Sequence, residues 1–368
     1  MNESTPDDIE PTMASLFEQL DTEGMTGFTR SFVHDLRSGF EAVNNERFPW
    51  IEDMKRTRWQ GVLCLGMGGS AAGGDFLATL AGLQGSVPVH VHRDYELPAW
   101  WSPAHLVLAT SYSGNTEETV AATEAALRKG GTVVVIATGG HLAGLTETSD
   151  SCHLVPCTGG QPPRTAFGHM FSRQLALMEH LGFIQAQEPQ HRSAMLDRLQ
   201  QHNESLDVLN HHEGDIALLA ASLAEQPIAA LGPTELSPVL NRLKNQFNEN
   251  ASRFVRVGSF PEMNHNESVA WGGVGDSKDP DAPNQALLFL SWDGMHPRVK
   301  QRMAWMVAHC TTETAWNLVG EGSSLLETLL YHCMVMDWLS LALGVLHGKN
   351  PANIGPIDSL KGHLGSVQ

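Results

Sequence analysis

The sequence contains few cysteines, and no two of them form a C-x-x-C pair. The five are Cys64, Cys152, Cys157, Cys310 and Cys333. An odd number without close pairs argues against a disulfide framework and is typical of reduced, mostly buried thiols. We therefore expect a cytoplasmic protein.

Basic residues are also scarce. The chain has 23 Lys and Arg against 41 Asp and Glu, for a net charge of −18. This balance argues against nucleic acid and anionic membranes as partners. It gives an anionic substrate no long-range attraction, so a pocket for an anion must attract it through local groups.

Long uninterrupted apolar runs are missing too. The most apolar stretch, residues 325–346, is broken by Glu327, His332 and Asp337. These polar residues favour a buried or subunit-interface helix over a membrane span. Residues 1–11 are acidic and polar and lack the basic-then-apolar pattern of a signal peptide.

What the sequence does have is a regular alternation of short apolar runs with helical stretches. Five strands are predicted in the first half, at 61–66, 88–92, 105–110, 132–137 and 152–155, and four in the second, at 227–231, 253–257, 286–292 and 316–319. Helices are predicted at 116–129, 236–250, 297–310 and 323–347, and residues 172–214 are helical in pattern. This alternation is typical of parallel sheets covered by helices on both faces. We expect an α/β protein with two doubly wound halves.

A chain of 368 residues is long enough to form two domains. The expected division is an N-terminal helical segment (1–45), a first α/β half (46–190), a second α/β half (191–348) and a C-terminal helical segment (349–368).

A glycine-rich turn, residues 65–75, follows the first predicted strand. It contains Gly68, Gly69 and Ser70 at the start of a helix. Glycines let the backbone approach a ligand closely, and the free amides of a helix N-terminus attract an anion. The turn is therefore a candidate phosphate site.

A second turn, residues 110–119, follows the third predicted strand and is rich in hydroxyls, including Ser111, Ser113 and Thr116. Hydroxyls and amides together supply the converging donors that a phosphate needs. The alternative is an ordinary strand-to-helix turn in which Ser113 and Thr116 are helix caps. Two such turns at the carboxyl ends of strands in one sheet favour the phosphate site.

A dinucleotide site is the competing functional hypothesis. Gly66-x-Gly68-x-x-Ala71 fits a loose dinucleotide fingerprint, and Asp94 follows the second strand as a ribose-binding acid would. The hydroxyl-rich turn has no role in such a site and counts against it.

At these residues the chain resembles the sugar isomerase (SIS) domain family. The turn 66–70 and the loop 111–119 look like that family's signature, and segments 159–168, 245–251 and 261–267 are similar to the bifunctional phosphoglucose/phosphomannose isomerases within it. The resemblance covers about residues 40–361.

The resemblance implies two SIS-type subdomains, a homodimer with shared active sites and no cofactor. It also implies that glucose 6-phosphate or mannose 6-phosphate is interconverted with fructose 6-phosphate. By motif position, the phosphate ligands are Ser70, Ser111, Ser113 and Thr116, beside Gly68 and Gly69.

The same resemblance implies four catalytic residues. Glu249 is the base, His265 opens the sugar ring in the partner subunit's site, Arg164 stabilises charge and Lys361 lies near the sugar. These residue types suit aldose–ketose isomerisation, because a carboxylate can carry a proton between C1 and C2 while a cation faces the enediolate. Taken without the family, each has a plainer interpretation: a surface glutamate, a loop histidine, a structural ion pair and an exposed lysine.

One segment departs from the family pattern. Relatives usually have threonine after Asp-Pro, where this chain has Asn350-Pro351-Ala352. The resemblance implies that this threonine helps the site accept both C2 epimers, so the departure puts the mannose activity in question. No metal site is expected, because the pair His211-His212 beside Glu213 is better explained by a solvated helix. The alternatives to an isomerase are a non-catalytic sugar-phosphate sensor and a nicotinamide-dependent oxidoreductase.

Overall fold

The computed structural model describes residues 11–366, so the acidic residues 1–10 lie outside the described part of the chain. The described chain opens with four helices: α1 (Met13–Leu20), α2 (Met25–Arg30), α3 (Phe32–Ala42) and α4 (Trp50–Arg56). Helix α3 packs on α8 of the first α/β half. Of the predicted N-terminal helical segment, α3 therefore covers the first half, whereas α1 and α2 pack against α14 (Leu325–Leu346).

The first half is built on a five-stranded parallel sheet in the order β2-β1-β3-β4-β5. Its strands are β1 (Gly61–Leu65), β2 (Val89–His92), β3 (His105–Thr110), β4 (Val133–Ala137) and β5 (Cys152–Pro156). The helices of this half are α5 (Gly68–Gln84), α6 (Glu117–Arg128), α7 (Gly140–Thr148) and α8 (Phe167–His180). Strands β1 and β4 are apolar and buried at every residue, as expected where helices cover both faces.

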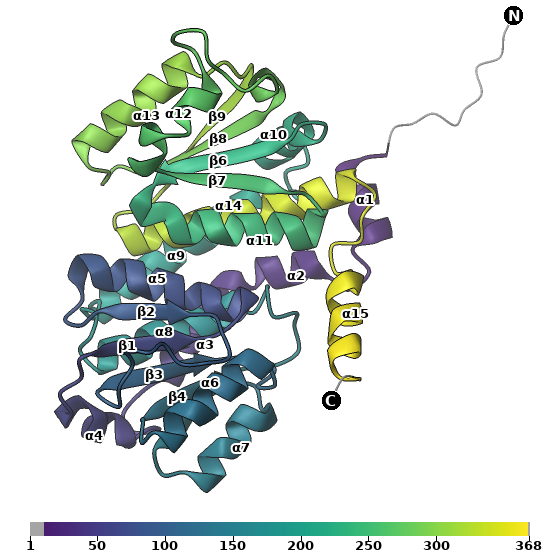
Figure 1. Cartoon of the computed structure of the whole chain (residues 1–368). Coiled ribbons are helices and arrows are strands. Elements are labelled where there is room, and N and C mark those ends of the chain that lie inside the picture. Colours follow the sequence, from purple (N-terminus) through teal and green to yellow (C-terminus); the bar gives the residue numbers. More distant parts are fainter. Residues whose placement is uncertain (1–10, 367–368) are drawn as a thin grey trace, which may run out of the picture.

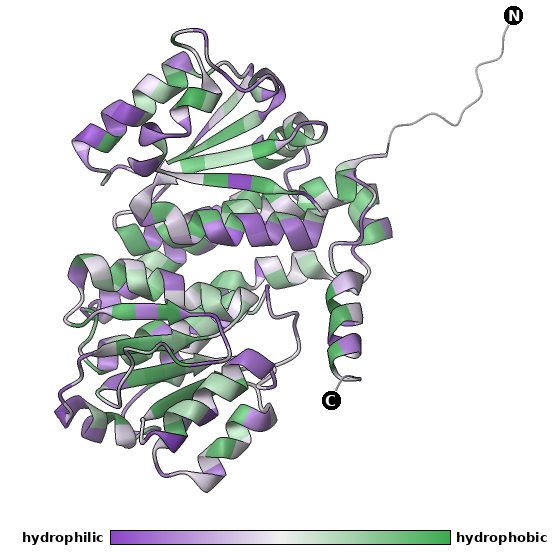
Figure 2. Cartoon of the chain, viewed as in Figure 1, coloured by the Kyte–Doolittle hydropathy of each residue, from purple (hydrophilic) through white to green (hydrophobic). Residues whose placement is uncertain are grey.

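The second half repeats this design with a four-stranded parallel sheet in the order β7-β6-β8-β9. Its strands are β6 (Ile228–Pro233), β7 (Val255–Phe260), β8 (Ala286–Ser291) and β9 (Thr314–Val319). Its helices are α9 (Pro189–Leu206), α10 (Asp215–Leu223), α11 (Ser237–Ala251), α12 (Ser268–Trp271) and α13 (Pro297–His309). In both halves the first strand of the sheet lies between the second and the third. Figure 2 shows the strands of both sheets as largely hydrophobic segments.

The predicted fold class is confirmed: the described chain has two doubly wound parallel sheets flanked by helices, with a helical segment at its C-terminal end. All nine predicted strands are present, and their ends shift by at most three residues. Strand β7 shows why the observed ends differ from the predicted ones. It continues past the apolar run to Phe260 because its ladder with β6 runs on to Pro233.

Helix α14 (Leu325–Leu346) is the one helix of residues 11–366 that is long and apolar enough to cross a membrane. It is a core helix instead: 89% of its most apolar 18-residue stretch is buried inside the protein, where the helix packs against α11, α10 and α9. Its Asp337 forms a buried ion pair at 2.6 Å with Arg242 of α11. The prediction of a buried helix agrees with this placement.

The two halves meet through α11 and α5, which pack against each other between the sheets (Figure 1). Helix α11 therefore contacts the helix that follows the glycine-rich turn. Helix α15 (Gly355–Leu364) stands beside the body of the protein and buries none of its residues.

Candidate functional site

The two candidate phosphate turns lie side by side at one edge of the first sheet. Strands β1 and β3 are parallel neighbours, so the turns that follow them leave from the same edge. The chain passes from β1 to β2 on one side and returns to β3 on the other, and this reversal creates the crevice where open α/β sheets bind ligands. The backbone amide of Tyr112 donates to Ser70 Oγ at 3.2 Å, which joins the two turns directly.

The glycine-rich turn is shaped by close backbone contacts. Helix α5 begins at Gly68, and no side chain caps its N-terminus. Gly68 itself has φ +51°, a conformation that favours glycine. A Cβ on Gly69 would lie 3.2 Å from the carbonyl oxygen of Pro163 and 3.3 Å from Cα of Arg164. The glycine therefore lets the turn approach the backbone of Arg164.

The hydroxyl-rich turn holds its side chains in a cluster. The hydroxyls of Ser111 and Thr116 lie 2.9 Å apart, and Ser111 Oγ accepts from the amide of Gly114 at 3.1 Å. Thr116 occupies the N-cap position of α6, but its side chain makes no capping hydrogen bond. Ser113 is exposed and accepts from the amide of Asn115 at 3.3 Å. The simple helix-cap interpretation therefore does not account for the Thr116 hydroxyl.

Ser70 and Ser111 are both buried, and the Ser70 hydroxyl bonds to groups outside its own turn. Ser70 accepts from Tyr112 and donates to the sulfur of Met170 at 3.6 Å. Its hydroxyl is thus engaged within the protein, where it fixes one turn against the other.

Arg164 links the glycine-rich turn to Glu249. Its side chain is only 3% exposed, and its Nη1 lies 3.5 Å from Oε2 of Glu249, which is 24% exposed. Two further bonds fix the guanidinium: Nε donates to Asn250 at 2.8 Å and Nη2 to the carbonyl of Pro351 at 2.6 Å. Burial lowers the pKa of Arg164, and the carboxylates of Glu249 and Glu23 oppose that shift. The result is a fixed cation beside a partly exposed carboxylate.

Two members of this cluster were not predicted from the sequence. Asn250 accepts from Arg164 and donates to Ser340 of α14 at 2.9 Å. Lys349, just beyond the end of α14, donates to the main-chain carbonyl of Glu249. The only signal in the sequence was adjacency: Asn250 follows Glu249, and Lys349 precedes Asn350-Pro351-Ala352, the segment that departs from the family pattern.

His265 and Lys361 are not joined to this cluster by any contact within the described chain. His265 ends a short 3-10 turn (Glu262–His265) after β7, and Lys361 lies in α15. Both are exposed, and neither side chain forms a hydrogen bond or ion pair with residues 11–366. The single chain thus brings together the two turns, Arg164 and Glu249, and leaves the other two candidates on the surface.

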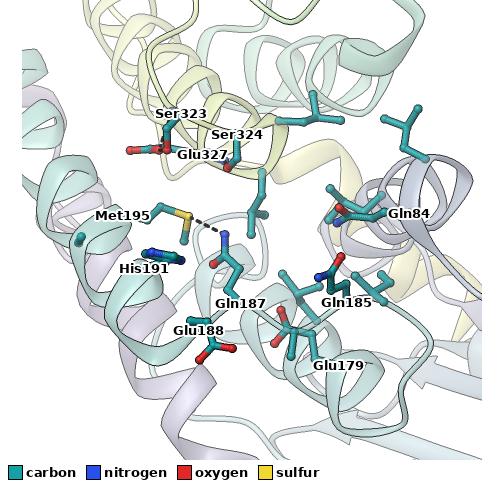
Figure 3. A pocket seen from close by; sticks show the side chains of 18 of the residues that line it. Gln84, Glu179, Gln185, Gln187, Glu188, His191, Met195, Ser323, Ser324 and Glu327 are labelled. Atoms are coloured by element: carbon teal, nitrogen blue, oxygen red, sulfur yellow. Dashed lines mark hydrogen bonds between the residues drawn. The ribbon is translucent and has the colours of Figure 1, made fainter.

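A cavity of about 590 Å³ lies elsewhere, between the two halves. Figure 3 shows its lining, which includes Gln84 from the C-terminal end of α5, far along that helix from Gly68. Its buried carboxylates already have partners: Glu179 pairs with Arg192 at 2.5 Å and Glu327 with Arg198 at 2.7 Å. None of the predicted site residues lines this cavity.

Residues 11–366 contain no group of three or more His, Cys, Asp or Glu side chains that could hold a metal ion. The five cysteines are all free. The charged side chains of the candidate site are Arg164, Glu249 and Lys349, with Glu23 near Arg164.

Family models match both halves of the chain. A model described as SIS domain matches residues 57–150, and one described as bacterial phospho-glucose isomerase C-terminal SIS domain matches residues 213–364. The chain belongs to the SIS domain family. The predicted family is confirmed, and the turns and Glu249 lie within the two matched regions.

Curated relatives of this SIS-family chain extend over most of its length. The bifunctional phosphoglucose/phosphomannose isomerase of Aquifex aeolicus is 29% identical over 325 residues, which cover 86% of this chain and 95% of the relative. The enzyme of the same name from Caldicellulosiruptor bescii is 28% identical over 317 residues, covering 83% and 90%. These relatives confirm the prediction of an isomerase enzyme.

Solved structures show the same fold. Tagatose-6-phosphate ketose/aldose isomerase from Escherichia coli superposes with a TM-score of 0.66 at 16% identity, covering 88% of this chain and 94% of that one. At this identity the likeness concerns the fold alone.

Proposed function

We propose that this chain is an aldose–ketose isomerase that interconverts glucose 6-phosphate with fructose 6-phosphate, and that mannose 6-phosphate is a second aldose substrate. The observation that carries the proposal is the position of Arg164. Its backbone adjoins Gly69 of the glycine-rich turn, and its side chain adjoins Glu249. One residue thus connects the candidate phosphate site with the candidate base.

The phosphate is proposed to bind at the first sheet edge. The uncapped N-terminus of α5 offers amides, and the turn after β3 offers the hydroxyls of Ser111, Ser113 and Thr116. Uncharged donors of this kind, together with the helix dipole, attract an anion locally even in a chain of net charge −18. The substrate then extends from this edge toward α11.

The proton transfer is assigned to Glu249. After ring opening, its carboxylate removes the proton from C2 of the aldose, and the electron pair of the C–H bond forms the enediolate. The same carboxyl group returns the proton to C1 while the hydroxyl proton on O2 passes to O1, which gives the ketose. Arg164 remains charged throughout, because the pKa of a guanidinium lies far above neutrality, and its side chain is placed to stabilise the enediolate oxygen.

Ring opening is assigned to His265 of the partner subunit in a homodimer with shared active sites. This assignment accounts for the exposure of His265 and for its lack of partners in residues 11–366. Lys361, on the exposed helix α15, is proposed to approach the sugar in the same assembly. A cytoplasmic location, and the division of the chain at residues 45, 190 and 348, are part of the proposal.

The test is a coupled assay of the purified protein with glucose 6-phosphate and mannose 6-phosphate as separate substrates. We expect fructose 6-phosphate from the first, and a slower rate from the second because Ala352 stands where relatives usually have threonine. Binding of both sugars without turnover of either would instead indicate a non-catalytic sugar-phosphate sensor. Thermal stabilisation by a nicotinamide cofactor would indicate an oxidoreductase.

A further inference from the structure

Lys349 makes an unusual contact with the residue proposed as the base. It follows α14, is half-buried, and its Nζ donates to the main-chain carbonyl of Glu249 in the last turn of α11. The last carbonyls of a helix lack partners within the helix, and a cation is favourable at that end of the helix dipole. Lys349 therefore fixes the turn from which the Glu249 carboxylate projects.

The charges around Lys349 are those of the candidate site. Burial, and then the neighbouring Arg164 guanidinium, lower the pKa of the Lys349 ammonium, while the Glu249 carboxylate opposes that shift. Two cations thus surround one carboxylate, with Glu23 as a further acidic group near Arg164. With all four groups ionised, the charges of Arg164 and Lys349 balance those of Glu249 and Glu23.

We propose that Lys349 is a positioning residue for the isomerisation: it anchors the turn that carries Glu249 and supplies a second cation beside Glu249 while negative charge moves to the substrate. This inference rests on the proposed function. Before proton transfer the negative charge is on Glu249. Afterwards Glu249 is neutral, the enediolate is negative, and Lys349 and Arg164 still carry their charges. Without Lys349, Arg164 alone would face the charges of both Glu249 and Glu23.

A purely structural role predicts a different result. If Lys349 only caps α11, its loss lowers the melting temperature and leaves the turnover of the folded protein unchanged. If Lys349 positions Glu249, turnover falls in protein that is still folded and still binds substrate.

The experiment compares wild type, Lys349→Met and Lys349→Arg, with Lys244→Met on α11, the helix that carries Glu249, as the matched control. Lys244 lies on α11, and its side chain makes no hydrogen bond or ion pair with the described residues. We expect Lys349→Met to lower kcat by about tenfold or more, on the scale of a misplaced catalytic group, with KM changed by less than about threefold. We expect Lys349→Arg to recover most of the loss, and Lys244→Met to match wild type.

Equal kcat in wild type and Lys349→Met, or no recovery in Lys349→Arg, would overturn the inference while leaving the proposed function intact. An inactive wild type would overturn the proposed function itself, and this inference with it. Circular dichroism melting reports whether each variant is folded. If Lys349→Met does not fold, Lys349→Gln takes its place, since an amide still donates to the Glu249 carbonyl without the charge. Its kcat is then expected to fall about tenfold, and an unchanged kcat would overturn the role of the charge.

Discussion

The Nη1 atom of Arg164 lies 3.5 Å from Oε2 of Glu249, although the two residues belong to different halves of the chain. Arg164 follows the first sheet, and Glu249 lies near the end of α11 in the second half. Because α11 packs on α5, the helix that follows the glycine-rich turn, this pair is held close to the proposed phosphate site. The candidate active site is therefore formed at the junction of the two halves.

Replacing Arg164 by lysine tests the geometry of this pair. Lysine keeps a positive charge but loses the planar fork that contacts Asn250, Pro351 and Glu249. We expect Arg164→Lys to lower kcat by about 10²-fold, on the scale of one lost transition-state donor. Steady-state kinetics checks this, with Arg128→Lys on the exposed face of α6 as the control. A kcat within twofold of wild type would show that the charge alone is sufficient.

The hydroxyl-rich turn is tested by the double variant Ser113→Ala, Thr116→Ala. These hydroxyls are expected to bind phosphate equally well in the ground state and the transition state, so their loss should chiefly raise KM. We expect KM to rise by about tenfold, and kcat to change by less than about threefold. Thr146→Ala, on α7, is a control for loss of a hydroxyl elsewhere in the same half. A fall in kcat with unchanged KM would place the phosphate in another part of the protein.

Removal of metal ions is expected to leave the rate unchanged. In the proposed mechanism Arg164 supplies the charge that stabilises the enediolate, so no step is assigned to a metal. The measurement is the coupled assay after dialysis against EDTA, repeated after addition of Mg²⁺ or Zn²⁺. Loss of activity on dialysis that the added ion restores would contradict the mechanism.

Acid stability is expected to depend on His332 in the core of the second half. Its side chain is fully buried, and Nε2 donates to the carbonyl of Ser291 at 3.1 Å. Burial lowers its pKa from 6.5 to about 4. Below pH 6.5 the unfolded chain takes up a proton that the folded chain resists, so this stabilising contribution is full above pH 6.5 and is lost as the pH falls toward 4. The loss is on the order of 3 kcal/mol for such a shift.

The check is urea unfolding of wild type and His332→Gln at several pH values between 7 and 4 (the approximate range set by the two pKa values). Stability of the wild type should decline through this range, and the decline should be shallower in His332→Gln. His363→Gln, on the exposed helix α15, controls for loss of a surface histidine. Parallel curves for wild type and His332→Gln would contradict the assignment.

Much of the fold could be predicted because its signals are local. Strand β4 is a run of buried apolar residues, and α6 is bounded by the hydroxyl-rich turn and Gly130, so both were found close to their observed ends. The ends of β6 and β7 were less predictable, because the pairing of the two strands, rather than their hydrophobicity, extends them.

The candidate site, like the fold, could be predicted only in part. The two turns follow adjacent strands, so their approach at one sheet edge follows from the parallel topology. Lys349 and Asn250 could not be found from sequence pattern, because their roles depend on contacts between segments far apart in the chain. His265 and Lys361 have no contact in the described chain that indicates a role, and their assignment depends on the proposed dimer.

Exchange of a C1 hydrogen of fructose 6-phosphate with deuterium in D₂O, followed by NMR, tests most directly whether Glu249 carries the proton. The protonated carboxyl group can exchange its hydrogen with solvent before returning it, so wild type should incorporate deuterium. Glu249→Gln should bind the sugar but slow this exchange by at least about 10²-fold. Exchange by Glu249→Gln at the wild-type rate would contradict the account.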